Sequence, residues 1–244
     1  MAYVSYPDGT LWRSRVDGSE KMQLTFPPVR AYEPRWSPDG SKIVFLDVRL
    51  FHPWKILVLS SSGGSPELLV NEGGKEAESD PTWTPDGKSI VFARQDVGTG
   101  HSAIYRLDFD TKKVSPIPDS QGLCSPRLSP DGRYICAFTY PTTSLRLFDA
   151  STNHWSSLVE KEELSYNEWS HDGIYVYMRA NHGGAPELVR VRIKDGVLEH
   201  VESLKDFPQL GDIFAGWIGL TPDDSPLLMR DRSVQEIYAL DLHF

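Results

Sequence analysis

Cysteine is scarce in this sequence of 244 residues, which holds only Cys124 and Cys136. Both lie in a stretch that reads as two strands joined by a turn at Asp131-Gly132. Folding that hairpin places Cys136 opposite a residue about one to three positions after Cys124, so the two thiols are out of register and a disulfide would be strained. We therefore predict two free thiols, which leaves the compartment open between periplasm and cytoplasm.

The sequence also lacks long apolar runs and clusters of basic residues. No stretch of about eighteen apolar residues predicts a transmembrane helix, and the first residues do not form the charged and apolar regions of a signal peptide. Lys and Arg number 25 against 34 Asp and Glu, for a net charge of −9. Because no basic run offers an electrostatic footprint for phosphates, we predict that this domain contacts neither nucleic acid nor a membrane.

Motifs of common enzyme classes are missing as well. The sequence contains no Gly-x-Ser-x-Gly nucleophile elbow. It contains no phosphate-binding P-loop, no His-Glu-x-x-His and no paired Cys-x-x-Cys. We predict that the chain is not an enzyme and uses no cofactor.

A repeat built on Pro-Asp-Gly dominates what is present. Its Asp falls at positions 39, 86, 131, 172 and 223, in steps of 47, 45, 41 and 51 residues. A large apolar residue stands three positions before each Asp: Trp36, Trp83, Leu128, Trp169 and Leu220. A period of this length indicates a propeller or a solenoid.

Each copy of the repeat predicts a β-hairpin. Pro presets φ for the turn, Asp hydrogen-bonds the turn backbone and Gly tolerates positive φ, so we interpret the aspartates as turn residues and not as ligands or catalytic acids. The following runs, such as residues 43–46 and 90–93, are apolar at consecutive positions. This pattern is typical of strands covered on both faces, as in stacked blades. We interpret the repeated Trp or Leu as packing between blades.

We therefore predict an all-β fold, a β-propeller that forms a single domain over residues 1–244. It has six blade units of mostly four antiparallel strands, with the first and last units three-stranded. Two alternatives stay open: a six-bladed ring with two lean end blades, or a fragment of a larger propeller. The predicted units cover about residues 1–26, 33–70, 80–117, 125–159, 166–203 and 213–244.

The motif Pro-x-Trp-Ser-Pro-Asp-Gly-x-x-Ile-x-Phe at residues 34–45, with its copy at 81–92, resembles the repeat of TolB-like bacterial β-propellers, which are related to WD-repeat propellers. The resemblance covers nearly the whole chain. The tail at 215–227 and 235–241 resembles the end of bacterial regulators in which such a propeller follows a winged-helix DNA-binding domain or a serine/threonine kinase. These resemblances imply a sensory or protein-binding module of a larger bacterial signalling protein.

Two sets of residues are candidate ligand contacts. Loops between second and third strands carry histidines, which are common transition-metal ligands. Several second strands end in arginine, which could bind a carboxylate or phosphate of a partner. Solvated loops and local ion pairs explain both sets more simply. The residues are His52, His101, His182, Arg94, Arg179 and Arg230.

We predict a non-catalytic sensory or binding module that recognises a protein or a small-molecule ligand on one propeller face. That face bears the entrances of the inner strands and the loops just described. The alternative is a metal-assisted polysaccharide lyase or hydrolase with a histidine site at the channel. The ligand and the oligomeric state are left open by the sequence.

Overall fold

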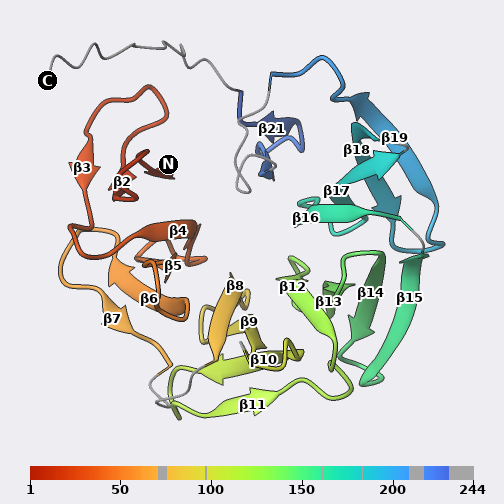
Figure 1. Ribbon diagram of the computed structural model, residues 1–244, viewed down its shortest axis with the longest axis horizontal. Coiled ribbons are helices and arrows are strands. Elements are labelled where there is room, and N and C mark those ends of the chain that lie inside the picture. The colour runs from red at the N-terminus through yellow and green to blue at the C-terminus, as the bar shows by residue number, and fades with distance from the viewer. Residues whose placement is uncertain (71–75, 97, 161, 183, 209–216, 231–244) are drawn as a thin grey trace, which may run out of the picture.

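A ring of antiparallel sheets forms the protein, as the computed structural model shows (Figure 1). The structure describes residues 1–70, 76–96, 98–160, 162–182, 184–208 and 217–230, and not the side chain of His182. In each blade, strands that follow one another in the chain are hydrogen-bonded neighbours. The prediction of an all-β propeller is confirmed.

Five blades of three or four strands make up most of the ring. The first blade consists of β1 (Ala2–Val4), β2 (Leu11–Arg13) and β3 (Met22–Gln23). The second consists of β4 (Ala31–Trp36), β5 (Lys42–Asp47), β6 (Lys55–Ser60) and β7 (Glu67–Leu68). The third consists of β8 (Ala77–Trp83), β9 (Ser89–Gln95), β10 (Ser102–Asp108) and β11 (Val114–Pro116). The fourth consists of β12 (Leu123–Leu128), β13 (Tyr134–Thr139), β14 (Ser144–Asp149) and β15 (His154–Glu160). The fifth consists of β16 (Leu164–Trp169), β17 (Tyr175–His182), β18 (Ala185–Arg192) and β19 (Leu198–Ser203).

The prediction of six blade units was wrong in its count. Within the described residues the last repeat forms only a two-stranded sheet, β20 (Ile218–Leu220) with β21 (Pro226–Leu228). Its turn keeps the local chemistry, since the backbone N–H of Ser225 donates to Thr221 Oγ1 at 3.0 Å. Such a turn specifies a hairpin, but it does not specify the outer strands that make a blade. Residues 213–216 and 231–244 of the predicted sixth unit lie outside the described residues.

Hydrogen bonds inside the Pro-Asp-Gly turns confirm that the aspartates are structural. Ser37 Oγ donates to Asp39 at 2.6 Å, and the backbone N–H of Lys42 donates to Ser37 Oγ at 2.9 Å. Gly40 has a φ of 69°, a conformation that glycine adopts without strain. The hydroxyl-to-Asp bond recurs at 2.6 Å in blades three, four and five. In blade two, the hydrogen bond from Ser37, followed by those from Ser41, lowers the pKa of Asp39 to about 2, because each bond favours the charged carboxylate.

The hydrophobic core lies between blades. Val44 of blade two packs with Phe92 of blade three in one buried cluster, for example. The repeated tryptophans join neighbouring blades by hydrogen bonds too: Trp83 Nε1 donates to the backbone oxygen of Arg35 at 3.1 Å, and Trp169 Nε1 to that of Arg127 at 3.0 Å. The interpretation of the repeated Trp as packing between blades is confirmed at these two positions.

A bulge interrupts the innermost strand of each four-stranded blade. One residue with positive φ lies in every bulge, although this left-handed conformation costs a non-glycine residue about 1 kcal/mol. A bulge re-aims side chains, and here it brings one residue from each of four blades to the ring centre. The bulge residues are Glu33, Asp80, Ser125 and Tyr166, with φ of 48°, 54°, 51° and 53°.

Both cysteines are free thiols, as predicted. Cys136 lies opposite Arg127 across the β12–β13 ladder, out of register with Cys124. Burial raises the pKa of each thiol to about 12. Nowhere in the described ranges is there a helix long and apolar enough to cross a membrane.

Candidate functional site

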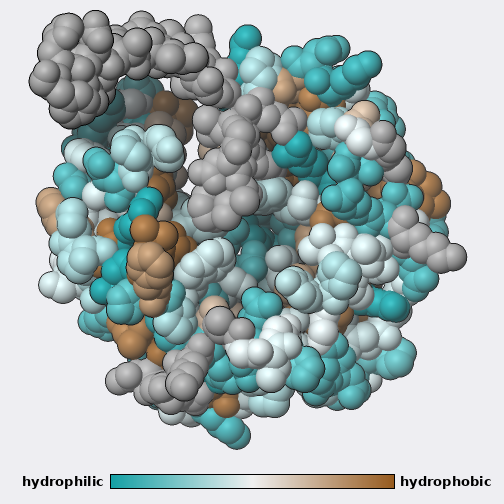
Figure 2. All heavy atoms as spheres, in the orientation of Figure 1, coloured by the Kyte–Doolittle hydropathy of each residue, from teal (hydrophilic) through white to brown (hydrophobic). Residues whose placement is uncertain are grey.

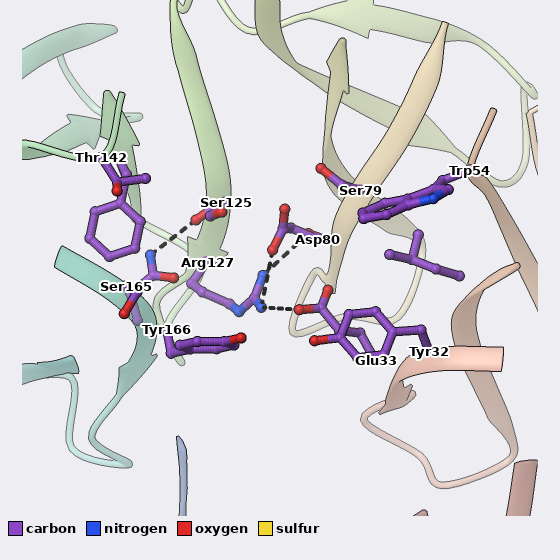
Figure 3. A pocket seen from close by; sticks show the side chains of 13 residues that line it. Tyr32, Glu33, Trp54, Ser79, Asp80, Ser125, Arg127, Thr142, Ser165 and Tyr166 are labelled. Carbon is purple, nitrogen blue, oxygen red and sulfur yellow. Dashed lines mark hydrogen bonds and ion pairs between the residues drawn. The ribbon is translucent and has the colours of Figure 1, made fainter. Parts of the chain in front are cut away.

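A cavity of about 350 Å³, which we call the central cavity, lies where the inner strands of blades two to five meet. Figure 2 shows a hollow at the centre of the ring, bordered by hydrophilic residues. All four bulge residues are among the thirteen that line the cavity. Tyr32, Trp54 and Tyr166 add aromatic walls, and Ser79 and Asn167 add further polar groups. Figure 3 shows these side chains gathered from strands far apart in the sequence.

Among the described residues that line the cavity, Arg127 is the only basic one, and its guanidinium faces two acids (Figure 3). Its Nη2 lies 3.6 Å from Asp80 Oδ1 and 4.0 Å from Glu33 Oε1. Its Nη1 donates to the backbone oxygens of Pro126 at 2.9 Å and Asp80 at 3.3 Å. The two carboxylates therefore share one guanidinium, which is held mainly by backbone oxygens.

The surroundings of Glu33 disfavour its charge. Its side chain is only 10% exposed. Burial, followed by repulsion from Asp80, raises the pKa of Glu33 to about 7, although Arg127 and Arg35 act in the opposite direction. The cavity therefore holds a carboxyl that changes charge near neutral pH.

A second ion pair crosses the ring centre beside the cavity. Arg35 Nη1 of β4 donates to Glu168 Oε2 of β16 at 2.6 Å. Blades two and five are not neighbours in the ring, so this pair joins opposite inner strands. Neither residue lines the central cavity.

Two buried polar atoms of the cavity lining have no hydrogen-bond partner within the described part of the chain. They are Nε of Arg127 and Oδ1 of Asn167, in residues that are 5% and 2% exposed. The amide nitrogen of Asn167 does donate to the backbone oxygen of Ser125, at 3.0 Å. A buried group without a partner costs about 1–3 kcal/mol and calls for an explanation, such as a polar ligand or a bound water.

The structure does not bring His52 or His101, two of the predicted loop histidines, into the central cavity. His52 and His101 are exposed, in the loops of blades two and three. The side chain of His182 lies outside the described residues. Across the described ranges, no three His, Cys, Asp or Glu side chains are grouped so that they could hold a metal ion.

The predicted arginines also lie apart from the central cavity. Arg94 is 9% exposed, pairs with Glu76 at 3.3 Å and stacks over the ring of Tyr105. Arg179 lines a second pocket between blades four and five, and burial lowers its pKa. Arg230 is exposed after β21. Their predicted role as ligand contacts stays a prediction.

The residues that line the central cavity were missed by reasoning from the sequence. A signal for them exists: position six before the turn Asp changes type from copy to copy, while the flanking motif is kept. That position holds Glu33, Asp80, Ser125 and Tyr166. A position that varies within a constant structural repeat is free of folding requirements other than its backbone conformation.

Comparison with solved structures identifies the architecture. TolB from Acinetobacter baumannii is similar with a TM-score of 0.73 and 20% identity, over 91% of this chain and 55% of that one. A putative TolB from Agrobacterium tumefaciens has a TM-score of 0.68 and 20% identity, over 81% of this chain and 75% of that one. The fold is that of a TolB propeller. The predicted TolB-like character is thus confirmed for the fold, and the chain spans about half the length of the first of these proteins.

Enzymes share the architecture too. An oligogalacturonate lyase in complex with manganese has a TM-score of 0.61 and 14% identity, over 79% of this chain and 54% of that one. At these identities the likeness shows the fold alone. No family model matches the sequence, and no curated protein matches it.

Proposed function

We propose that this chain is a non-catalytic β-propeller module that binds a protein or a small ligand at the central cavity. One observation carries the proposal: the cavity holds two buried polar atoms, Arg127 Nε and Asn167 Oδ1, that have no partner among the described residues. They lie beside two carboxylates that share one guanidinium. A bound group would satisfy these atoms. The TolB-like fold supports the proposal, since the resemblance implies a sensory or protein-binding module.

The wider setting is a larger bacterial regulatory or signalling protein, which we propose from the resemblance of the tail to such proteins. The loop histidines and the strand-end arginines would then be outer contacts around the cavity. Similarity to the manganese-bound lyase supports a shared fold only and is no argument for a shared reaction. Turnover of oligogalacturonate by this chain, lost on His101→Ala, would contradict a non-catalytic role.

A displayed random peptide library, panned on the immobilised chain, tests the proposal. Thr142, which lines the cavity from the loop between β13 and β14, offers a place to block the entrance. We expect peptides that bind the wild type to lose binding at least tenfold on Thr142→Trp. The matched control is Lys88→Trp, since Lys88 is exposed in a Pro-Asp-Gly turn, at the other end of the inner strands. Peptides that bind both variants alike would overturn the placement of the site at the central cavity, and a library with no binders would overturn the binding of a protein there.

A further inference from the structure

The lining of the central cavity has an excess of negative charge. Among the described lining residues, the titratable ones other than tyrosines are Glu33, Asp80 and Arg127, and the rest are uncharged. Two carboxylates against one guanidinium leave one net negative charge when Glu33 is ionised. In a largely buried site, an unbalanced charge is unfavourable unless another charge is added or a proton is taken up.

The two carboxylates are held loosely. Charge-assisted hydrogen bonds between nitrogen and carboxylate oxygen measure about 2.7–2.9 Å. The distances from Arg127 Nη2, 3.6 Å to Asp80 and 4.0 Å to Glu33, are well beyond that range. At these distances neither carboxylate accepts a charge-assisted hydrogen bond of normal length from the Arg127 guanidinium. Acceptor capacity thus remains at both acids.

The rest of the lining also suits a cation. The aromatic side chains of Tyr32, Trp54 and Tyr166 stand around the two acids (Figure 3). Aromatic faces attract ammonium groups through the ring quadrupole. Asn167 Oδ1 is a further buried acceptor without a partner among the described residues. A compact group with several N–H donors and one positive charge fits such surroundings, whereas an anion would meet the excess of acid.

We infer that the central cavity binds a primary ammonium group, from a lysine side chain or from the amino terminus of a polypeptide. The ammonium N–H groups donate to the carboxylates of Glu33 and Asp80, and its charge balances the lining. A metal ion fits less well, since no third carboxylate, thiolate or imidazole of the described residues joins the two acids. This inference rests on the proposed function, because it names the chemistry of the group bound at the same cavity.

The two sources of the ammonium group differ in one feature. An amino terminus carries a carbonyl oxygen next to its ammonium, and that oxygen could accept from Arg127 Nε, the donor without a partner. A lysine side chain carries no such acceptor, but its four methylenes contact aromatic walls. Small probes of each kind separate the two sources.

Calorimetric titration at pH 7.5 tests the inference. The probes are N-acetyl-lysine methylamide for a lysine side chain, alaninamide for an amino terminus, and N-acetyl-norleucine methylamide as the uncharged control. We expect at least one ammonium probe to bind at least tenfold more tightly than the norleucine probe. Glu33→Gln and Asp80→Asn keep the size of each side chain and should each weaken that binding at least tenfold. The matched control is Glu163→Gln, on the exposed rim outside the central cavity, which should leave the binding unchanged.

The pH dependence of probe affinity gives a second readout, which would not change if Glu33 had only a structural role. Binding of the lysine probe should strengthen from pH 6 to pH 7.5 in the wild type, as Glu33 ionises, and should be flat over this range in Glu33→Gln. The charged groups that face Glu33 are Asp80 of β8, Arg127 of β12, Glu168 of β16 and Arg35 of its own strand. Thermal melts of each variant establish that it folds.

The outcomes separate the two proposals. Equal binding of lysine and norleucine probes, with both lost on Thr142→Trp, would end the ammonium inference and leave the cavity as a binding site. Absence of binding by both ammonium probes would also end the inference, while library peptides blocked by Thr142→Trp would still support the proposed function. Ammonium binding that Glu33→Gln and Asp80→Asn do not change would place the site elsewhere and overturn the inference.

Discussion

Replacing Glu33 by Gln should stabilise the protein at alkaline pH. Burial and the nearby Asp80 raise the pKa of Glu33 to about 7, from an ordinary value of 4.5. The folded state therefore disfavours the ionised carboxylate, even with Arg127 beside it. Gln has the shape of the protonated acid and carries no charge, so the variant removes this unfavourable term.

The sign and size follow from proton linkage. Below pH 4.5 the carboxyl is neutral in the folded and the unfolded chain, and Glu33 contributes no pH dependence. Between pH 4.5 and pH 7 the unfolded chain releases the proton while the folded chain keeps it, so the free energy of unfolding falls as pH rises. A pKa difference of this size corresponds to a loss of up to about 3 kcal/mol, complete above pH 7.

Urea unfolding at several pH values, followed by tryptophan fluorescence, measures this effect. We expect Glu33→Gln to match the wild type at pH 4 and to exceed its free energy of unfolding by up to about 3 kcal/mol at pH 8. Glu163→Gln, at an exposed carboxylate, is the control and should follow the wild type at both pH values. A Glu33→Gln protein that is less stable than the wild type at pH 8 would refute the reasoning, since the ion pair with Arg127 would then outweigh burial.

Three further predictions follow from the fold. Trp169→Phe should lower the free energy of unfolding by about 1–3 kcal/mol in urea titrations, because the backbone oxygen of Arg127 loses its buried donor. The control, Trp36→Phe, changes a residue that is 37% exposed and should lower the free energy of unfolding by less than about 0.5 kcal/mol. Equal losses in the two variants would contradict a role of Trp169 in joining blades. Cys124 and Cys136, whose pKa values burial raises to about 12, should react with a thiol reagent at pH 8 only after unfolding, so fast labelling of the native protein would be inconsistent with the structure. The free energy of unfolding should also fall on acidification from about pH 4 towards pH 2, because the turn bonds that lower the pKa of Asp39 are lost when its carboxylate is protonated. In acid titrations monitored by circular dichroism, Asp39→Asn should make part of that fall smaller.

Much of the blade architecture could be predicted because its signals are local. The apolar run predicted as a strand at 90–93 falls within β9, Ser89–Gln95, which pairs with the strands just before and after it in the chain. The turn residues, such as Asp86 with Thr84, bond to each other within a few positions. Local turn chemistry also explains the error at the last repeat, because the turn is kept there while the described residues form only a two-stranded hairpin.

The central cavity could not be predicted in the same way. The motif did not predict the bulge that turns Glu33 and Asp80 towards the ring centre. A positive φ is usually predicted from glycine, and here residues other than glycine adopt it. The loop histidines were predicted as ligand contacts instead, because histidine is a common metal ligand. The structure places His52 and His101 on exposed loops.

The sequence by itself determined the hairpin turns, the order of strands within blades and the free thiols, since each depends on residues close together in the chain. Only the tertiary structure decided that Glu33, Asp80 and Arg127 meet, because they come from three blades and approach one another when the ring forms. Their burial then sets the electrostatics, because charges on side chains this little exposed are screened less than charges on the surface. The raised pKa of Glu33, and the buried atoms of Arg127 and Asn167 that find no partner in the described part of the chain, are therefore properties of the assembled ring and of no single repeat.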